Sequence, residues 1–369
     1  MITIDKRRRK SEMKKIKLGL LTLSIILGVI LAGCNSDSNQ STSSPNKIKK
    51  ESQTVKNTQY YFTANEGGSI SKIDSSTNKV VKTINVDGAV HNVQVSPDGK
   101  MIGATVVPSM NHNEDSHDEG TMEMKGKVLF FDTATSKLIN SVEVGNHPAH
   151  IVFTEDGKRV LVTNNEDNNV SVIDTDTFTV TNTIKTGQGP HGFRISSDSQ
   201  KAYIANMGED TISVLNLSTL KGEKKIKVGS TPVTTGITSD GKILVATLNA
   251  EDSLAIVNLS NNQVKKVKVG NGPAQVYIDA SNRYAYVANQ GTEEAPSHSV
   301  TMVDLKSNTA IATIETGNGS HGVVTSSDGK RLYVTNMFEN TVSVIDTKSK
   351  KVIDTIKVGK TPNGISIMK

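Results

Sequence analysis

The sequence predicts an all-β protein, a seven-bladed β-propeller of four-stranded antiparallel blades closed by pairing of the N- and C-terminal strands. Three observations predict this fold. A unit of 42 residues recurs along residues 59–369, each unit holds four short stretches of strand composition, and the two ends of this region supply complementary parts of one unit. Four antiparallel strands in about 40 to 45 residues is the period of a propeller blade.

The period is visible in the residue that ends each stretch of the "VIDT" kind. It occurs seven times, as Asp74, Asp132, Asp174, Asn216, Asn258, Asp304 and Asp346. The spacings are 58, 42, 42, 42, 46 and 42 residues. The chain therefore holds seven copies of one unit, with a large insertion near 108–126 and a small one near 290–298.

The unit at 190–229 shows the four strands most clearly. "GFRIS" alternates, "AYIAN" is apolar, "TISVLNL" alternates again, and "KKIKVG" closes the unit. Val, Ile, Thr and Tyr between Gly, Asn and Asp are typical of short strands. Asp-Gly pairs predict a tight turn between the first two strands in the blades where they occur, at 98–99, 156–157, 240–241 and 328–329.

The two ends of the repeat region are complementary. The region begins with "QYYFTAN", a second-strand sequence, and ends with "TPNGISIMK", a first-strand sequence. We therefore expect residues 363–368 to complete the blade begun by residues 59–86. Such pairing closes the ring and removes open sheet edges.

Several second-strand segments carry a family resemblance. "LYVTN" (332–336), "YVANQ" (286–290) and "LVTNN" (161–165), together with the "VSVIDT" segments, resemble the YVTN family of β-propeller repeats, in particular YncE-like bacterial lipoproteins. The resemblance covers residues 59–369. It implies the seven-bladed fold, and it implies little about function because these motifs are structural.

The N-terminal segment has the pattern of a lipoprotein signal. Basic residues precede the apolar run "LGLLTLSIILGVI", which ends in "LAGC" at residues 31–34 and resembles the bacterial lipobox. We expect a signal peptide at 1–33, a lipid on Cys34 and a flexible polar tether over 34–58, so that the propeller (59–369) is held at the cell membrane on its extracytoplasmic side. The apolar run is short for the roughly 20 residues of a membrane span. Met13 is an alternative start.

Cysteine count and charge exclude two classes of protein. Cys34 is the only cysteine, so no intramolecular disulfide can form. The formal charge of +5 is misleading, because residues 1–33 hold eight Lys and Arg but two acidic residues, which leaves 34 basic and 35 acidic residues beyond them. This near-neutral balance gives no electrostatic case for nucleic-acid binding.

All histidines map to one face of the predicted propeller. Inter-blade links and the loops between second and third strands share that face. Links carry His91, His147, His150, His191 and His321, and the loops carry His112, His117 and His298. Links begin the innermost strands, so their residues surround the mouth of the central channel.

Four of these histidines form a candidate metal site. His91, His191 and His321 occupy equivalent link positions, and His150 is displaced by one residue. Neutral imidazole binds copper, zinc or iron, and rigid blades can bring ligands together with little rearrangement. An alternative is that His191 and His321 only satisfy backbone groups at the channel mouth.

The large insertion is the second candidate. It reads "MNHNEDSHDEGTMEMKG" over residues 110–126 and combines imidazoles and thioethers with five carboxylates. Thioether sulfur favours Cu(I), so the segment is a candidate copper-capture loop through His112, His117, Met110, Met122 and Met124. The alternative is a solvated loop, which its acidic residues favour.

Three classes of function remain open. The first is a non-catalytic, membrane-anchored binding module that presents a scaffold to a protein, glycan or small ligand without a metal. The second is such a module that binds copper through the His/Met-rich face. The propeller of nitrous oxide reductase, which holds a His-ligated copper cluster at its channel mouth, is a distant resemblance that supports copper. The last class is a metal-dependent lactonase-like hydrolase. The sequence holds no G-x-S-x-G, P-loop or Rossmann motif, so we expect no catalytic residues.

Overall fold

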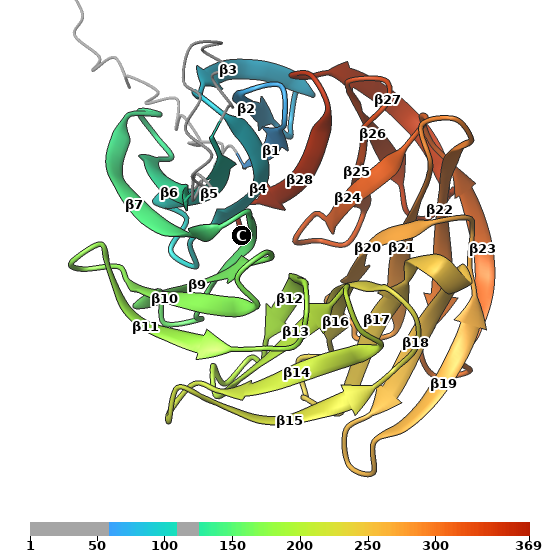
Figure 1. Ribbon diagram of the computed structural model, residues 1–369. Coiled ribbons are helices and arrows are strands. Elements are labelled where there is room, and N and C mark those ends of the chain that lie inside the picture. The colour runs from blue at the N-terminus through green and yellow to red at the C-terminus, as the bar shows by residue number, and fades with distance from the viewer. Residues whose placement is uncertain (1–58, 109–124) are drawn as a thin grey trace, which may run out of the picture. The chain divides into compact units, whose positions relative to one another are not determined.

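A ring of seven blades makes up the folded domain. The computed structural model describes residues 59–108 and 125–369. Within them, 28 strands form seven antiparallel sheets of four strands each, arranged around a central channel (Figure 1). The predicted fold class is confirmed. The described residues contain a single 3₁₀ turn, Asn249–Glu251, and none of their helices is long and apolar enough to cross a membrane.

The blades follow one another along the chain, each from its innermost to its outermost strand. Blade 1 contains β28 (Pro362–Ile367), β1 (Tyr60–Asn65), β2 (Ser69–Asp74) and β3 (Lys79–Asn85). Blade 2 contains β4 (Ala89–Val95), β5 (Met101–Val107), β6 (Lys125–Asp132) and β7 (Leu138–Asn146). Blade 3 contains β8 (Pro148–Phe153), β9 (Arg159–Asn164), β10 (Asn169–Asp174) and β11 (Thr179–Lys185). Blade 4 contains β12 (Pro190–Ile195), β13 (Lys201–Asn206), β14 (Thr211–Asn216) and β15 (Lys221–Lys227).

The remaining three blades repeat the order. Blade 5 contains β16 (Pro232–Ile237), β17 (Ile243–Leu248), β18 (Ser253–Asn258) and β19 (Gln263–Lys268). Blade 6 contains β20 (Pro273–Ile278), β21 (Tyr284–Gly291), β22 (Pro296–Asp304) and β23 (Thr309–Glu315). Blade 7 contains β24 (Ser320–Thr325), β25 (Arg331–Asn336), β26 (Thr341–Asp346) and β27 (Lys351–Lys357). The innermost strands contact one another in turn, and β28 contacts β4, so the ring is closed.

The predicted turns between first and second strands are confirmed. Gly99, Gly157, Gly241 and Gly329 have φ between 67° and 72°, a left-handed conformation that glycine adopts without steric cost. In each of these turns the glycine N–H donates to the carbonyl of the residue three positions earlier. The Asp-Gly pairs therefore fix the register in which the innermost strand meets its neighbour.

Each innermost strand carries a β-bulge near its start. In blade 3, Pro148 pairs with Asn164 and Ile151 pairs with Val162, so Ala149 and His150 together lie opposite Thr163. The pairing shifts at the equivalent place in the other six blades. A bulge changes the alternation of side chains along the strand. Residues on both sides of the bulge can therefore face the channel.

Buried threonine hydroxyls bridge neighbouring blades at four of these bulges. The hydroxyl of Thr163 accepts from the N–H of His150 at 2.9 Å and donates to the carbonyl of His191, in the next blade, at 2.8 Å. The Thr of the "YVTN" segment thus satisfies a backbone group that the bulge leaves unpaired. Equivalent bridges are made by Thr105, Thr247 and Thr335.

The asparagine of the same segment holds the link between blades. Asn206 donates to the hydroxyls of Thr211 and Ser213 at 2.9 and 3.0 Å, and its Oδ1 accepts from the N–H of Gly187 at 3.2 Å. Asn164 and Asn336 make the same kind of contacts. A buried amide satisfied in this way fixes the link, which positions the residues at the channel mouth.

The first blade is built from both ends of the domain, as the sequence predicts. Strand β28 pairs antiparallel with β1, with Tyr61 opposite Ile367 and Thr63 opposite Ile365. Ile365 is 6% exposed and packs in a cluster with Tyr61, Tyr333 and other residues of blades 1 and 7. The C-terminal strand therefore belongs to the hydrophobic core.

Ile365→Ala should lower the free energy of unfolding by about 2 to 5 kcal/mol, because it leaves a cavity at the ring closure. Ile353→Ala is the matched control: Ile353 lies on the outermost strand β27 with 50% of its side chain exposed, and we expect a change within about 0.5 kcal/mol. Urea unfolding of both variants measures the difference. Equal effects would contradict a core role for β28.

Candidate metal centre

Three histidines meet at the start of three neighbouring innermost strands. One ring nitrogen from each of His91 (β4), His150 (β8) and His191 (β12) lies within 4.8 Å of those of the other two. Ring centroids are 6.0 Å apart for His91 and His150, 5.3 Å for His91 and His191, and 4.8 Å for His150 and His191. In the pairing register His150 lies one position later than His91 and His191, and the bulge allows residues at both positions to face the channel.

Hydrogen bonds at Nδ1 orient two of these rings. Nδ1 of His191 lies 3.1 Å from the carbonyl oxygen of Val233, which can only accept, so this nitrogen carries a proton. Nδ1 of His91 lies 2.9 Å from Oε1 of Glu66, and the same oxygen accepts from the Asn363 amide at 2.7 Å. Metal-bound histidines commonly donate their second ring nitrogen to a carboxylate or a carbonyl in this way.

The other nitrogens of these two rings face each other. With Nδ1 protonated, a neutral imidazole presents a lone pair at Nε2, and Nε2 of His91 lies 3.2 Å from Nε2 of His191. Two lone pairs at this distance repel unless a proton or a cation lies between them. In addition, Nε2 of His150 is buried without a hydrogen-bond partner among the described residues. A single proton on His91 could not satisfy all of these groups.

Burial keeps these imidazoles uncharged. Burial, reinforced by the charge of His91, lowers the pKa of His191 to about 3. Burial, with smaller contributions from His191, His91 and Arg194, also holds the pKa of His150 well below its usual value. Only neutral imidazole can bind a metal, so these rings are ready to coordinate at neutral pH without losing a proton.

Glu66 is ionised beside them. Burial alone would raise the pKa of this carboxyl, but hydrogen bonds from His91 and Asn363 and the charge of His91 outweigh it and lower the pKa to about 2. A carboxylate behind a ligating imidazole raises the basicity of the ligand and offsets part of the charge of a bound cation. Glu66 directly follows the "TAN" segment of blade 1, on the face that carries the histidines, and sequence reasoning missed it because its partner is remote in sequence.

His321 lies outside this three-histidine group. It occupies the equivalent position in β24 and is buried, but its Nδ1 accepts from Nε2 of Gln275 at 3.4 Å. Burial and the charge of His91 lower its pKa to about 4, which indicates that it shares the channel with His91. An equivalent position in the strand was therefore not sufficient to bring all four predicted histidines together.

The other histidines are placed as follows. His147 lies at the rim with φ of 49°, 3.5 Å from a carboxylate oxygen of Glu166 and 6.2 Å from His91 between ring centroids. His298 is exposed and lies within strand β22, because the small insertion extends the hairpin of β21 and β22. The insertion residues and the lipidation residue fall outside the described residues: Met110, His112, His117, Met122, Met124 and Cys34.

Three histidine ligands would leave one position open in a four-coordinate site. Two ligands of a tetrahedral ion lie about 3.3 Å apart when each metal–nitrogen distance is about 2.0 to 2.1 Å. The separation of 3.2 Å between His91 and His191 already meets this requirement. The other separations between these nitrogens are at most 4.8 Å, so ring movements of up to roughly 1.5 Å would complete the site.

Three family models match parts of the chain. They are the YNCE-like beta-propeller over residues 225–369, the seven-bladed beta-propeller lactonase over 125–272, and the Choice-of-anchor I domain over 50–174. The chain is a seven-bladed β-propeller that resembles the YncE-like family over residues 225–369. A search of curated proteins finds no match.

Solved structures share the fold of this propeller at low sequence identity. Hydrazine synthase of Kuenenia stuttgartiensis is 21% identical with a TM-score of 0.65, covering 75% of this chain and 89% of that one. A functionally unknown protein of Desulfotomaculum acetoxidans is 13% identical with a TM-score of 0.70, covering 84% and 98%. A putative 6-phosphogluconolactonase of Bacteroides fragilis is 15% identical with a TM-score of 0.66, covering 86% and 99%.

Thr163→Val should cost about 1 to 3 kcal/mol of stability, because it leaves a buried N–H of His150 and a carbonyl of His191 unsatisfied. Thr247→Val, which breaks the equivalent bridge between blades 5 and 6, should cost a similar amount. Only Thr163→Val should shift the imidazole NMR signals of His150 and His191. Identical histidine spectra in the two variants would show that the bridge does not position the rings.

The metal-free protein should lose stability as the pH falls from about 6.5 to 5. Unfolded histidine binds a proton below about pH 6.5, whereas His191 stays neutral in the folded state until about pH 3. The unfolded state therefore gains protons first, and stability falls with decreasing pH. His191→Gln should remove about 1 to 2 kcal/mol of this dependence, while His298→Gln, a surface control, should leave it unchanged. Urea unfolding in the presence of a chelator measures how the free energy of unfolding of each variant changes with pH. An equal pH dependence in the two variants would contradict a lowered pKa of His191.

Proposed function

We propose that this propeller is a non-catalytic metal-binding protein that holds one copper ion at its channel mouth, on His91, His150 and His191. The observation that carries the proposal is the pair of Nε2 atoms 3.2 Å apart in rings whose Nδ1 atoms already face oxygen acceptors. A metal ion between them would accept a lone pair from each ring. The unpartnered Nε2 of the buried His150 supports the same conclusion.

Copper is proposed because of the donor set. All three candidate ligands are imidazoles, and Cu²⁺ has the highest affinity for such sites among the divalent first-row metals. Magnesium and calcium prefer carboxylate and carbonyl oxygens, and here the nearest carboxylate, Glu66, is held by His91 and Asn363. Zinc suits the same donors, so it is the competing outcome of the test.

The location is a further part of the proposal and is supported by the N-terminal sequence alone. A lipid on Cys34 would attach the protein to the cell membrane, and the tether of residues 34–58 would give the channel mouth access to metal outside the cytoplasm. The insertion, with His112, His117, Met110, Met122 and Met124, would deliver copper to the channel. A metal-free scaffold for a protein, glycan or small ligand is the alternative.

The purified protein, incubated with Cu²⁺ or Zn²⁺ and desalted, should retain about one equivalent of copper by elemental analysis. The variant His91→Gln/His150→Gln/His191→Gln should lose it, and His298→Gln should keep it. Deletion of 110–124 should slow loading without lowering the final content. Retention of less than about 0.2 equivalents of every metal by the unaltered protein would exclude the proposal, and loss only in the deletion variant would assign copper to the insertion.

Lactone hydrolysis is a second candidate. Its support is the open fourth position of the three-histidine group, which in catalytic zinc sites holds a water molecule with a pKa near 7, together with the lactonase model that matches residues 125–272. The metal-loaded protein and the triple histidine variant can be compared for opening of an aldonolactone ring. Rapid hydrolysis by the first protein alone would make this candidate the function.

A further inference from the structure

A second site lies deeper along the channel, on the same innermost strands. A cavity of about 380 Å³ is lined by residues from all seven of them, among them Gln94 of β4, Phe153 of β8, Arg194 of β12 and Tyr277 of β20. It lies toward the face of the Asp-Gly turns, because Pro97, Ser197 and Ser239 of the turns also line it. Arg194 is three residues beyond His191, so the cavity lies about 10 Å further along the strand.

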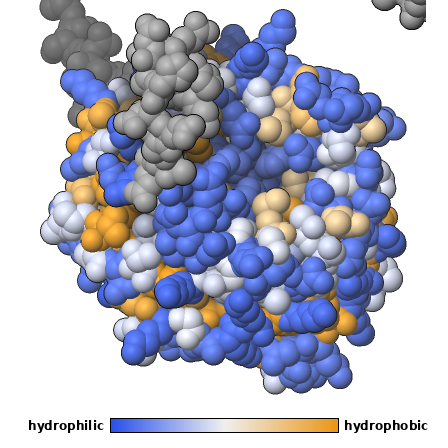
Figure 2. Space-filling view, viewed as in Figure 1, coloured by the Kyte–Doolittle hydropathy of each residue, from blue (hydrophilic) through white to orange (hydrophobic). Residues whose placement is uncertain are grey.

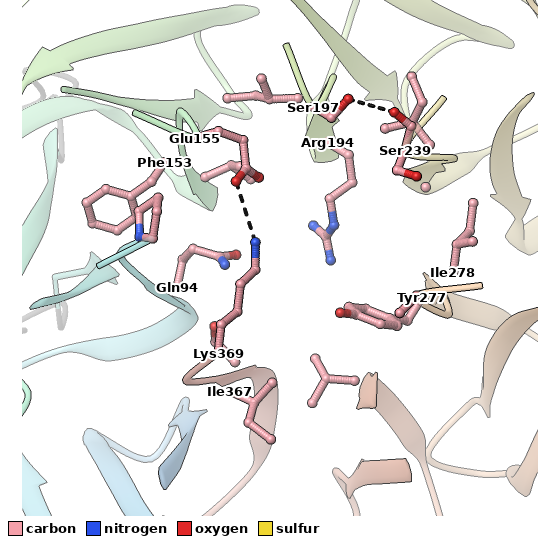
Figure 3. A pocket seen from close by; sticks show the side chains of 18 of the residues that line it. Gln94, Phe153, Glu155, Arg194, Ser197, Ser239, Tyr277, Ile278, Ile367 and Lys369 are labelled. Carbon is pink, nitrogen blue, oxygen red and sulfur yellow. Dashed lines mark hydrogen bonds and ion pairs between the residues drawn. The ribbon is translucent and has the colours of Figure 1, made fainter. Parts of the chain in front are cut away.

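Arg194 points into this cavity without an acidic partner. Figure 3 shows its guanidinium group in the open space, with Tyr277 and Gln94 directed toward the same space. Its only protein hydrogen bond within the described residues runs from one guanidinium nitrogen to the carbonyl of the adjacent Phe193 at 2.9 Å. No side-chain carboxylate among the described residues lies within ion-pair distance of the Arg194 guanidinium. Four of its five N–H donors are left for a ligand.

The other charged side chains around the cavity already have an ion-pair or hydrogen-bond partner. Lys369 lies 3.5 Å from a carboxylate oxygen of Glu155, as Figure 3 shows. Asp279 accepts from the backbone N–H groups of Arg283 and Tyr284 in its own turn. The remaining positive charge is that of Arg194, whose pKa is lowered by burial and partly restored by the neighbouring Tyr277. Arg194 is partly buried, and a partly buried guanidinium without a carboxylate partner favours an anion that reaches it.

We propose that this cavity binds a small organic anion whose carboxylate or phosphate group is held by the guanidinium of Arg194. The planar guanidinium matches either oxyanion with two parallel hydrogen bonds. Tyr277 and Gln94 supply further hydrogen-bonding groups, and Phe153 and Ile278 supply apolar wall for the rest of the molecule. The volume falls within the range of about 300 to 1,000 Å³ that small-molecule sites occupy.

The test uses the full-length protein freed of metal with a chelator, so that its outcome is independent of the three-histidine group. Citrate, benzoate, glycerol phosphate and inorganic phosphate are titrated at a constant chloride concentration of about 0.15 M, with calorimetry and thermal unfolding as readouts. Benzoate and citrate report on carboxylates, and the other two anions report on phosphates. We expect at least one class to bind and to raise the unfolding temperature.

Arg194→Gln should weaken that binding by at least about tenfold, and Arg194→Lys, which keeps the charge but loses the planar fork, should weaken it less. Arg331→Gln is the matched control, because Arg331 lies in another blade and is paired with Asp346 at 2.7 Å. Without ligand, Arg194→Gln should be as stable as the unaltered protein or more stable, since it removes a partly buried charge that has no carboxylate partner.

Two results would overturn the proposal. One is the absence of binding by any of the four anions up to about 10 mM. The other is equal binding by Arg194→Gln and the unaltered protein. A lower unfolding temperature of the ligand-free Arg194→Gln protein would show instead that the arginine supports the fold, and would also count against the site.

Discussion

The β-bulge at the start of each innermost strand is the constraint on which the rest of the structure depends. Seven strands that crowd one axis cannot keep regular pairing along their whole length, and each carries a bulge where two residues oppose one. The groups freed there are buried and need partners. In blade 3 the hydroxyl of Thr163 provides one, and by also bonding the carbonyl of His191 it ties that blade to the next. The requirement of the fold and the positions of the candidate ligands therefore have one cause.

The channel combines two kinds of chemistry along a few strands. At one end, three imidazoles with an ionised Glu66 behind that of His91 suit a cation. Toward the other end, the unpaired guanidinium of Arg194 suits an anion. The positive charge of Arg194 also contributes to the low pKa of His150. Outside the channel, the face seen in Figure 2 is mainly hydrophilic with scattered apolar residues.

The sequence was sufficient for the fold because the fold is repetitive. Seven copies of a 42-residue unit, the Asp-Gly turns and the complementary ends determine blades, register and closure, and the structure confirms each of them. Within the candidate site, the sequence placed His91, His150 and His191 at one mouth. It could not place Glu66 or Val233, because their contacts join residues 25 and 42 positions apart through the curvature of the ring. It also could not separate His321 from the group, because equivalent register fixes the height of a residue in the channel but not the direction in which its side chain turns. The sequence did not indicate Arg194, because strict alternation along a strand places residues three positions apart on opposite faces. The bulge between Pro190 and Phe193 changes this alternation, so Arg194 and His191 both face the channel.

The composite first blade has a consequence for the order of events during synthesis. Blades 2 to 7 are each made from contiguous sequence and can form as their residues leave the ribosome. Strand β1 instead waits for β28, whose Ile367 lies about 300 positions after its partner Tyr61. Contacts of such long range are slow to form because a long loop has to close first. Until β28 is made, the edge of β1 is unpaired and the core between blades 7 and 2 lacks its innermost strand, and this interval is when the nascent chain is most exposed to aggregation.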